Sequence, residues 1–98
     1  MLTLVPTTTF RRDAYAAGTA RCAFAMRLQR AGDALRNQAK TMPLGRGRAA
    51  AMIRGNMLLD AGEFVFWLAG GDRDEARRAL LRAREARALL GEVPDAPA

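Results

Sequence analysis

The segment LAGGDRDE, residues 68–75, contains the end of one helix and the beginning of the next. Gly70 and Gly71 supply the glycine at which helices commonly end, because glycine adopts a left-handed backbone without strain. Asp72 is a favoured N-cap residue, and Glu75 three positions later completes the spacing of a capping box. The segment therefore predicts a helical hairpin, in which one helix ends at residue 69 and the next begins at residue 72.

The residues on both sides of this turn have the apolar periodicity of helices. Residues 72–90 carry one apolar stripe, made of Ala76, Ala79, Leu80, Ala83, Ala86 and Leu90. Residues 48–69 carry two apolar sides, one with Ala49, Ile53, Met57, Phe64, Trp67 and Leu68, the other with Met52, Leu59 and Phe66. Two apolar sides predict that the helix of residues 48–69 is covered from two directions.

A long N-terminal helix is predicted for residues 9–41, which contain no proline. Its apolar stripe, predicted to face the core, consists of Ala17, Ala20, Phe24, Leu28, Ala31, Leu35 and Met42. Pro6 and the threonines after it predict an extended arm over residues 1–8, and residues 92–98 are predicted to be a flexible tail. Pro43, Gly45 and Gly47 mark the connection to the second helix. The predicted fold is an all-α three-helix bundle with a short arm before a long N-terminal helix.

Small residues recur seven positions apart on the first two predicted helices. They are Gly18, Ala25, Gly32 and Ala39 on the first, and Gly55, Gly62 and Ala69 on the second. Glycine inside a helix costs about 0.5 to 1 kcal/mol relative to alanine, so interior glycines need a compensating contact. We expect the two helices to approach closely along these lines; chance in a chain rich in glycine and alanine is the alternative.

Length and cysteine content limit the class of protein. A chain of 98 residues is expected to form one domain. The single cysteine, Cys22, excludes an intramolecular disulfide, and we expect the chain to be intracellular and cytoplasmic. Residues 1–10 lack the pattern of a signal peptide, and no apolar run is long enough to predict a membrane helix.

The charge is concentrated in the N-terminal half. Residues 1–56 hold ten basic and two acidic side chains, a net charge of +8, whereas residues 57–98 hold six basic and eight acidic ones, a net charge of −2. Fifteen of the sixteen basic residues are arginine, whose guanidinium forms bidentate contacts with carboxylates and phosphates. A GC-rich genome would also favour arginine, alanine and glycine codons, so composition alone leaves both explanations open.

An enzymatic function is not expected, because the chain has no histidine and so lacks the commonest general base and metal ligand. With one cysteine as well, we predict no metal site and no cofactor. Asp60 lies near the apolar side of the second predicted helix. We interpret it as half of a buried structural ion pair, with an arginine of the N-terminal helix as its partner.

A partner-binding surface is predicted on the N-terminal helix, opposite its apolar stripe. Tyr15, Cys22 and Met26 form an apolar strip there, with arginines on both flanks. The predicted partner-binding residues are Arg11, Arg12, Tyr15, Cys22, Met26, Arg27, Arg30, Arg36, Arg46 and Arg48. An apolar centre with a cationic rim favours an acidic protein partner over duplex DNA. The alternative is that another helix of the same chain buries the strip.

These observations predict a small non-enzymatic protein-binding module, such as a regulator, a chaperone-like protein or an inhibitor encoded by a mobile element. Nucleic-acid binding is the alternative, because Gly45-Arg46-Gly47-Arg48 resembles the core of an AT-hook, with Ala49 where a proline should follow. That alternative is a nucleic-acid-binding regulator that uses the basic N-terminal half and residues 45–48, which are expected to form a flexible loop. Two-sided helices and a thin core also predict a homodimer.

Overall fold

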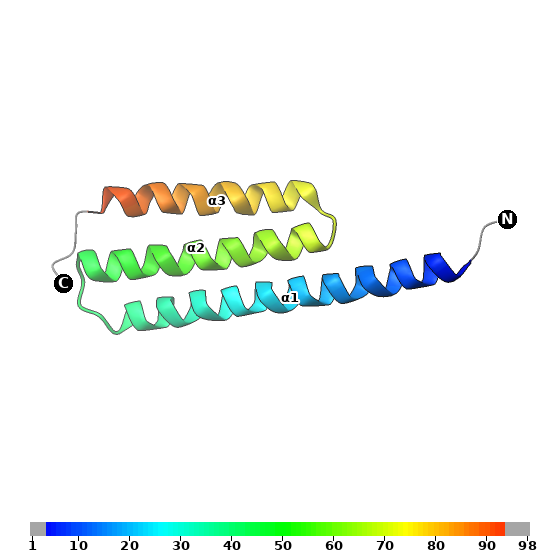
Figure 1. Cartoon of the computed structure of the whole chain (residues 1–98). Helices are drawn as coiled ribbons and strands as arrows, with labels where there is room; N and C mark the ends of the chain where they lie inside the picture. The colour runs from blue at the N-terminus through cyan, green and yellow to red at the C-terminus, as the bar shows by residue number, and fades with distance from the viewer. Residues whose placement is uncertain (1–3, 94–98) are drawn as a thin grey trace.

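The computed structural model describes residues 4–93, with side chains from residue 18 onward, and this part contains three helices and no strand. Helix α1 spans Leu4–Lys40, α2 spans Arg46–Ala69 and α3 spans Arg73–Glu92 (Figure 1). The predicted all-α fold of three helices, with the longest at the N-terminus, is confirmed.

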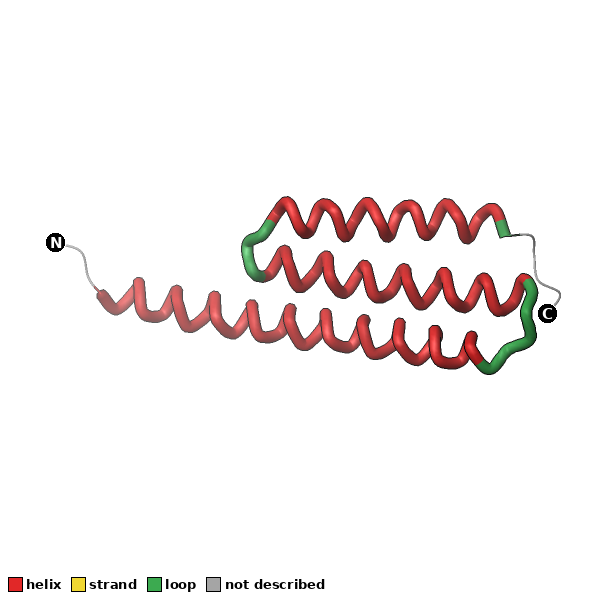
Figure 2. The backbone as a smooth tube through the Cα atoms, turned by 180° about the vertical axis from the view of Figure 1, so that it is seen from behind, coloured by secondary structure: helices red, strands yellow, loops and turns green. Residues whose placement is uncertain are grey.

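The three helices form a single antiparallel layer with α2 in the middle (Figures 1 and 2). Helix α2 packs on α1 along one side and on α3 along the other, while α1 and α3 share no contact within the described part of the chain. The Cα radius of gyration is 18.2 Å, compared with about 13 Å for a compact domain of 100 residues. Helix α2 is thus covered from two directions, as its two apolar sides predict, and both broad faces of the layer stay open.

The predicted N-terminal arm is wrong for residues 4–8, which belong to α1. Pro6 falls in the first turn of the helix, where backbone N–H groups have no partner in the helix, so its missing donor is not needed. The first turns of α1 extend past the turn between α2 and α3 (Figure 1). Helix α3 ends at Glu92; residues 1–3 of the arm and 94–98 of the predicted tail lie outside the described residues.

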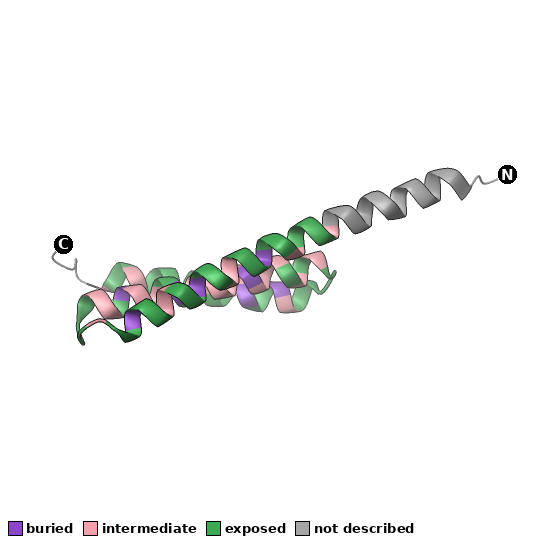
Figure 3. Cartoon of the chain, turned by 90° about the horizontal axis from the view of Figure 1, so that it is seen from below, coloured by how far each residue is buried: buried purple, intermediate pink, exposed green. Residues whose placement is uncertain are grey.

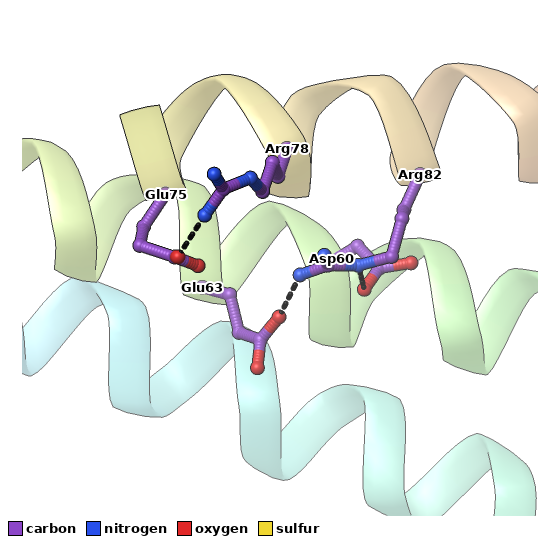
Figure 4. A network of polar contacts seen from close by, with 5 residues as sticks. All are labelled: Asp60, Glu63, Glu75, Arg78 and Arg82. Carbon is purple, nitrogen blue, oxygen red and sulfur yellow. Dashed lines mark hydrogen bonds and ion pairs between the residues drawn. The ribbon is translucent and has the colours of Figure 1, made fainter. Parts of the chain in front are cut away.

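The turn between α2 and α3 has the hydrogen bonds of a Schellman motif. Gly71 has a φ of 83°; its N–H donates to the Leu68 carbonyl at 3.1 Å, and the Asp72 N–H donates to the Trp67 carbonyl at 2.9 Å. Asp72 Oδ1 accepts a hydrogen bond from the Glu75 N–H at 3.0 Å, which confirms the N-cap. The reciprocal half of the capping box is absent, because the Glu75 carboxylate pairs with Arg78 (Figure 4).

We expect Asp72→Ala to lower the free energy of unfolding by about 1 kcal/mol, because the side-chain acceptor for the Glu75 N–H is lost. Asp72→Asn is the matched control, since asparagine caps helices as well as aspartate does. Thermal unfolding followed by circular dichroism measures both variants. Equal melting temperatures for the alanine and asparagine variants would show that the cap contributes nothing.

The contact between α1 and α2 is a close approach of two glycine-containing backbones. A Cβ on Gly32 would lie 2.7 Å from the Gly55 carbonyl oxygen, and a Cβ on Gly55 would lie 2.8 Å from the Gly32 carbonyl oxygen. A Cβ on Gly62 would lie 2.9 Å from the Ala25 carbonyl oxygen. Close packing along the predicted lines is therefore confirmed, except at Gly18, where a Cβ would meet nothing within 4 Å.

The core between the helices consists of small residues. Every buried hydrophobic side chain from residue 18 to residue 93 is an alanine, and they lie along the two lines where helices meet (Figure 3). They are Ala25, Ala39, Ala50, Ala76, Ala79 and Ala86. The last three confirm the predicted packing side of α3. No large side chain of this part is fully buried, so the larger apolar residues are half-buried or exposed.

Candidate functional site

One open face of the layer is polar. A groove of about 430 Å³ crosses all three helices there, and its polar lining includes Arg36, Asn56, Asp60, Glu63, Arg82 and Glu85. We call this side of the layer the polar face. Since side chains advance about 100° per residue, it also fixes which residues of each helix point to the opposite side.

An ion-pair network joins α2 and α3 on the polar face. Arg82 of α3 donates from Nε to Asp60 Oδ1 at 3.2 Å and from Nη2 to Glu63 Oε2, so one guanidinium joins α3 to two carboxylates of α2 (Figure 4). The hydrogen bonds that Arg82 donates, first to Asp60 and then to Glu63, raise the pKa of Arg82 above its usual value. Asp60 does form an ion pair, but the predicted partner is wrong: the arginine comes from α3, and the pair is partly exposed rather than buried.

Arg36 lies at the seam between α1 and α2 rather than on a free surface of α1. A Cβ on Gly55 would lie 2.6 Å from Arg36 Cγ, so the arginine stem occupies the space beside that glycine. Arg36 Nε is buried and has no hydrogen-bond partner. The close approach at Gly55 therefore holds Arg36 against α2, and the prediction that it flanks an open strip is wrong.

The opposite face of the layer is apolar. It contains Phe24, Leu28 and Leu35 of α1, Leu58 and Val65 of α2, and Leu80 of α3, which we call the apolar face. Phe24 is 46% exposed and the other five are half-buried. The α1 stripe predicted to face the core thus lies beside the seam, because Ala25, Gly32 and Ala39 occupy the line nearest α2.

Among residues 18–93, only arginine contributes charge to the apolar face. By helical position Arg54 of α2 and Arg84 and Arg87 of α3 lie on this side, and each is exposed without an ion pair to any described residue. Arg27 at the outer edge of α1 places its guanidinium carbon 5.8 Å from the centre of the Phe24 ring. The acidic residues from 18 to 93 lie on the polar face, on the outer edges or at the start of α3, so the charge on the apolar face is uncompensated.

A second apolar feature lies where α1 passes the end of α2. A groove of about 580 Å³ is lined there by Gly18, Thr19 and Cys22 of α1 and by Phe66 and Trp67 of α2, among others. The two aromatic rings meet edge to face, with centroids 5.2 Å apart. Space for the groove remains because α1 and α2 are in close contact at Gly32 and Gly62 but no longer at Gly18, where a Cβ would meet nothing within 4 Å.

The predicted partner-binding residues of α1 are divided among these surfaces. Cys22 lines the groove beside Phe66 and Trp67. Met26 is 51% exposed, so none of the three described helices covers it, and Arg30 is exposed one turn further along α1. Arg27 borders the apolar face. The side chains of Arg11, Arg12 and Tyr15 lie outside the described residues.

Arg46 and Arg48 are not in a loop, which corrects the prediction for residues 45–48. Helix α2 begins at Arg46, directly after Gly45, whose φ of 154° favours glycine. Arg48 Nη1 reaches back toward the Met42 carbonyl at 3.5 Å. An AT-hook uses an extended backbone to enter a minor groove, and these residues are helical instead.

Several residues of the open surfaces were not identified as candidate functional residues from the sequence. Arg54, Arg84 and Arg87 belong to two different helices, and only the packing of α3 on α2 places them on one side. The exposed Phe66 beside Trp67 was a detectable signal, since adjacent large aromatics near a helix end cannot both face a neighbouring helix.

No family model, no curated protein and no solved structure matches this chain. Within the described residues, no group of three or more metal-binding side chains is close enough together to hold a metal ion. None of the three helices, over the part searched, is both long and apolar enough to cross a membrane.

Proposed function

We propose that this chain is a small protein-binding module that uses the arginines of α1, together with the apolar residues beside them, to bind a protein partner with acidic groups. A regulator, a chaperone-like protein and an inhibitor all fit this description, and a cytoplasmic location remains our expectation. The observation that supports the proposal is the division of side chains by size: alanines fill the seams, whereas Phe24, Met26 and the leucines stay exposed or half-buried.

A surface that combines exposed large apolar residues with cations favours a protein partner. Protein interfaces have an apolar centre with polar residues around it, and arginine is enriched in them. Arg27 beside the exposed Phe24 ring shows this combination on α1. The absence of histidine from the sequence also argues against acid–base catalysis.

Capture of a partner from host lysate, with and without nuclease, tests the proposal. We expect capture of a protein that survives nuclease treatment and is lost in the double variant Arg27→Glu/Arg30→Glu. The double variant Lys40→Glu/Arg78→Glu has the same change in net charge at exposed positions away from the apolar face, and is the matched control. Capture that disappears with nuclease would support the alternative, a nucleic-acid-binding regulator, and would contradict a direct protein partner.

A further inference from the structure

We infer that the apolar face binds an amphipathic helix of a second protein, one whose apolar stripe is flanked by aspartate and glutamate. This inference rests on the proposed function and names the surface and the kind of partner. The juxtaposition that carries it is a half-buried apolar face whose charged neighbours, among residues 18–93, are all arginines without an ion pair.

The shape of the apolar face suits a helix. In a closed three-helix bundle the third helix packs on both of the others, but here α3 contacts α2 alone, so no helix of the described chain covers the α1–α2 pair on this face (Figure 2). By helical position Leu28, Leu35 and Leu58 lie beside the α1–α2 seam on this face, and they are half-buried. Side-chain ridges of a further helix can pack against the grooves between such rows at interaxial distances of about 8 to 10 Å. A bilayer would instead require side chains that project from the surface.

The positive charge of the apolar face favours acidic residues on both sides of the partner helix's apolar stripe. Arg54, Arg84 and Arg87 are exposed and carry no ion pair within the described residues, so carboxylates of a partner would find free guanidinium groups. On the polar face, by contrast, Arg82 already pairs with Asp60 and Glu63, and the carboxylate of Glu85 lines the same groove.

The same charges argue against a second copy of this chain as the occupant. Two apolar faces packed against each other would bring arginines toward arginines, with no acidic residue from 18 to 93 on that side to compensate. Like charges across an interface oppose association. A homodimer, which the sequence predicts, would therefore have to form through another surface.

Binding to two synthetic helical peptides of 20 residues tests the inference. Such a helix is about 30 Å long, comparable with α2. Both peptides carry the same leucine and alanine stripe, but one has glutamates and the other lysines along its flanks. Fluorescence anisotropy with the full chain is expected to show at least tenfold tighter binding of the glutamate peptide, with an affinity that falls as salt is added. Equal affinity for both peptides, or none for either, would overturn the inference.

Variants locate the binding. Leu58→Glu is expected to weaken the glutamate peptide at least tenfold, whereas Asn56→Glu on the polar face, with the same added charge on the same helix, leaves it unchanged. Arg84→Glu/Arg87→Glu replaces two free guanidinium groups with carboxylates, so it is expected to weaken binding of the glutamate peptide. Both side chains are exposed, so the fold should be unaffected, and circular dichroism checks the fold of every variant. Unchanged binding by both Leu58→Glu and the double arginine variant would overturn the inference.

Other occupants of the apolar face give different results. Light scattering that shows a dimer dissolved by Leu58→Glu would assign the face to a second copy, and sedimentation with phosphatidylglycerol vesicles lost on Leu58→Glu would assign it to a membrane; either overturns the inference. Nuclease-resistant capture from lysate that is lost in Arg27→Glu/Arg30→Glu but kept in Leu58→Glu would uphold the proposed function and refute this surface. Absence of any protein capture would refute the proposed function itself.

Discussion

Gly55→Ala is expected to lower the free energy of unfolding by about 2 kcal/mol, although alanine is the better helix former. A methyl group on Gly55 would lie 2.6 Å from Arg36 Cγ and 2.8 Å from the Gly32 carbonyl oxygen. The oxygen belongs to the backbone of α1, so the helices must separate, and forcing extra volume into a packed contact costs about 1 to 3 kcal/mol. In a domain of this length the melting temperature should fall by roughly 10 °C.

Gly18→Ala is the matched control for this prediction, because it makes the same substitution in α1 at a place where a Cβ meets nothing within 4 Å. Only helix propensity changes there, so the control should gain up to about 1 kcal/mol. Chemical denaturation of the two variants and the natural chain measures the difference. If Gly55→Ala were as stable as Gly18→Ala, the backbones of α1 and α2 would not be in close contact.

The contacts between neighbouring helices were predictable because they depend on local spacing. Seven residues make about two helical turns, so small residues seven apart fall on one side of a helix, and that pattern located the approach at Gly32 and Gly55. The turn was equally clear, since Gly71 and Asp72 each meet a specific backbone requirement. These features need no knowledge of how distant segments are arranged.

The arrangement of the layer was not predictable in the same way. An amphipathic stripe shows that a helix packs on something, but it does not say whether α3 lies in the α1–α2 groove or beyond α2. The partner of Asp60 depended on that choice, so the expected arginine of α1 was wrong and Arg82 of α3 is the partner. The start of α1 was missed because Pro6 was taken as a barrier, although the first turn of a helix tolerates it.

Only part of the candidate binding surface could be predicted, because the accessibility of a side chain depends on how the helices pair. Met26 is accessible on α1, as its position opposite the apolar stripe predicts, and Arg27 is exposed as well. Arg36 points into the seam because Gly55 leaves space for its stem, which only the paired structure reveals. The stripe of Leu28 and Leu35 was expected in a core, yet the alanines and glycines beside it make the contact with α2. A seam built from small residues brings two helices together and leaves the larger ones at its edge.

Ala79→Leu is expected to destabilise the contact between α2 and α3 by about 1 to 3 kcal/mol. Ala79 is fully buried, so three further carbon atoms have no space unless α3 moves away from α2. Leucine is close to alanine in helix propensity, which leaves packing as the cause. Ala88→Leu is the control, because Ala88 is exposed on the opposite side of the same helix and should change the stability little.

Hydrogen exchange of the Ala79→Leu variant shows which helices lose amide protection. Because α3 contacts α2 but not α1 in the described residues, the layer resembles a linear array in which each helix is held by its neighbours alone. Ala79→Leu should therefore speed exchange of α3 amides most, while amides near Gly32 and Gly55 keep their protection. Equal loss of protection in all three helices would mean instead that the layer unfolds as one cooperative unit, and that the α1–α2 pair has no stability without α3.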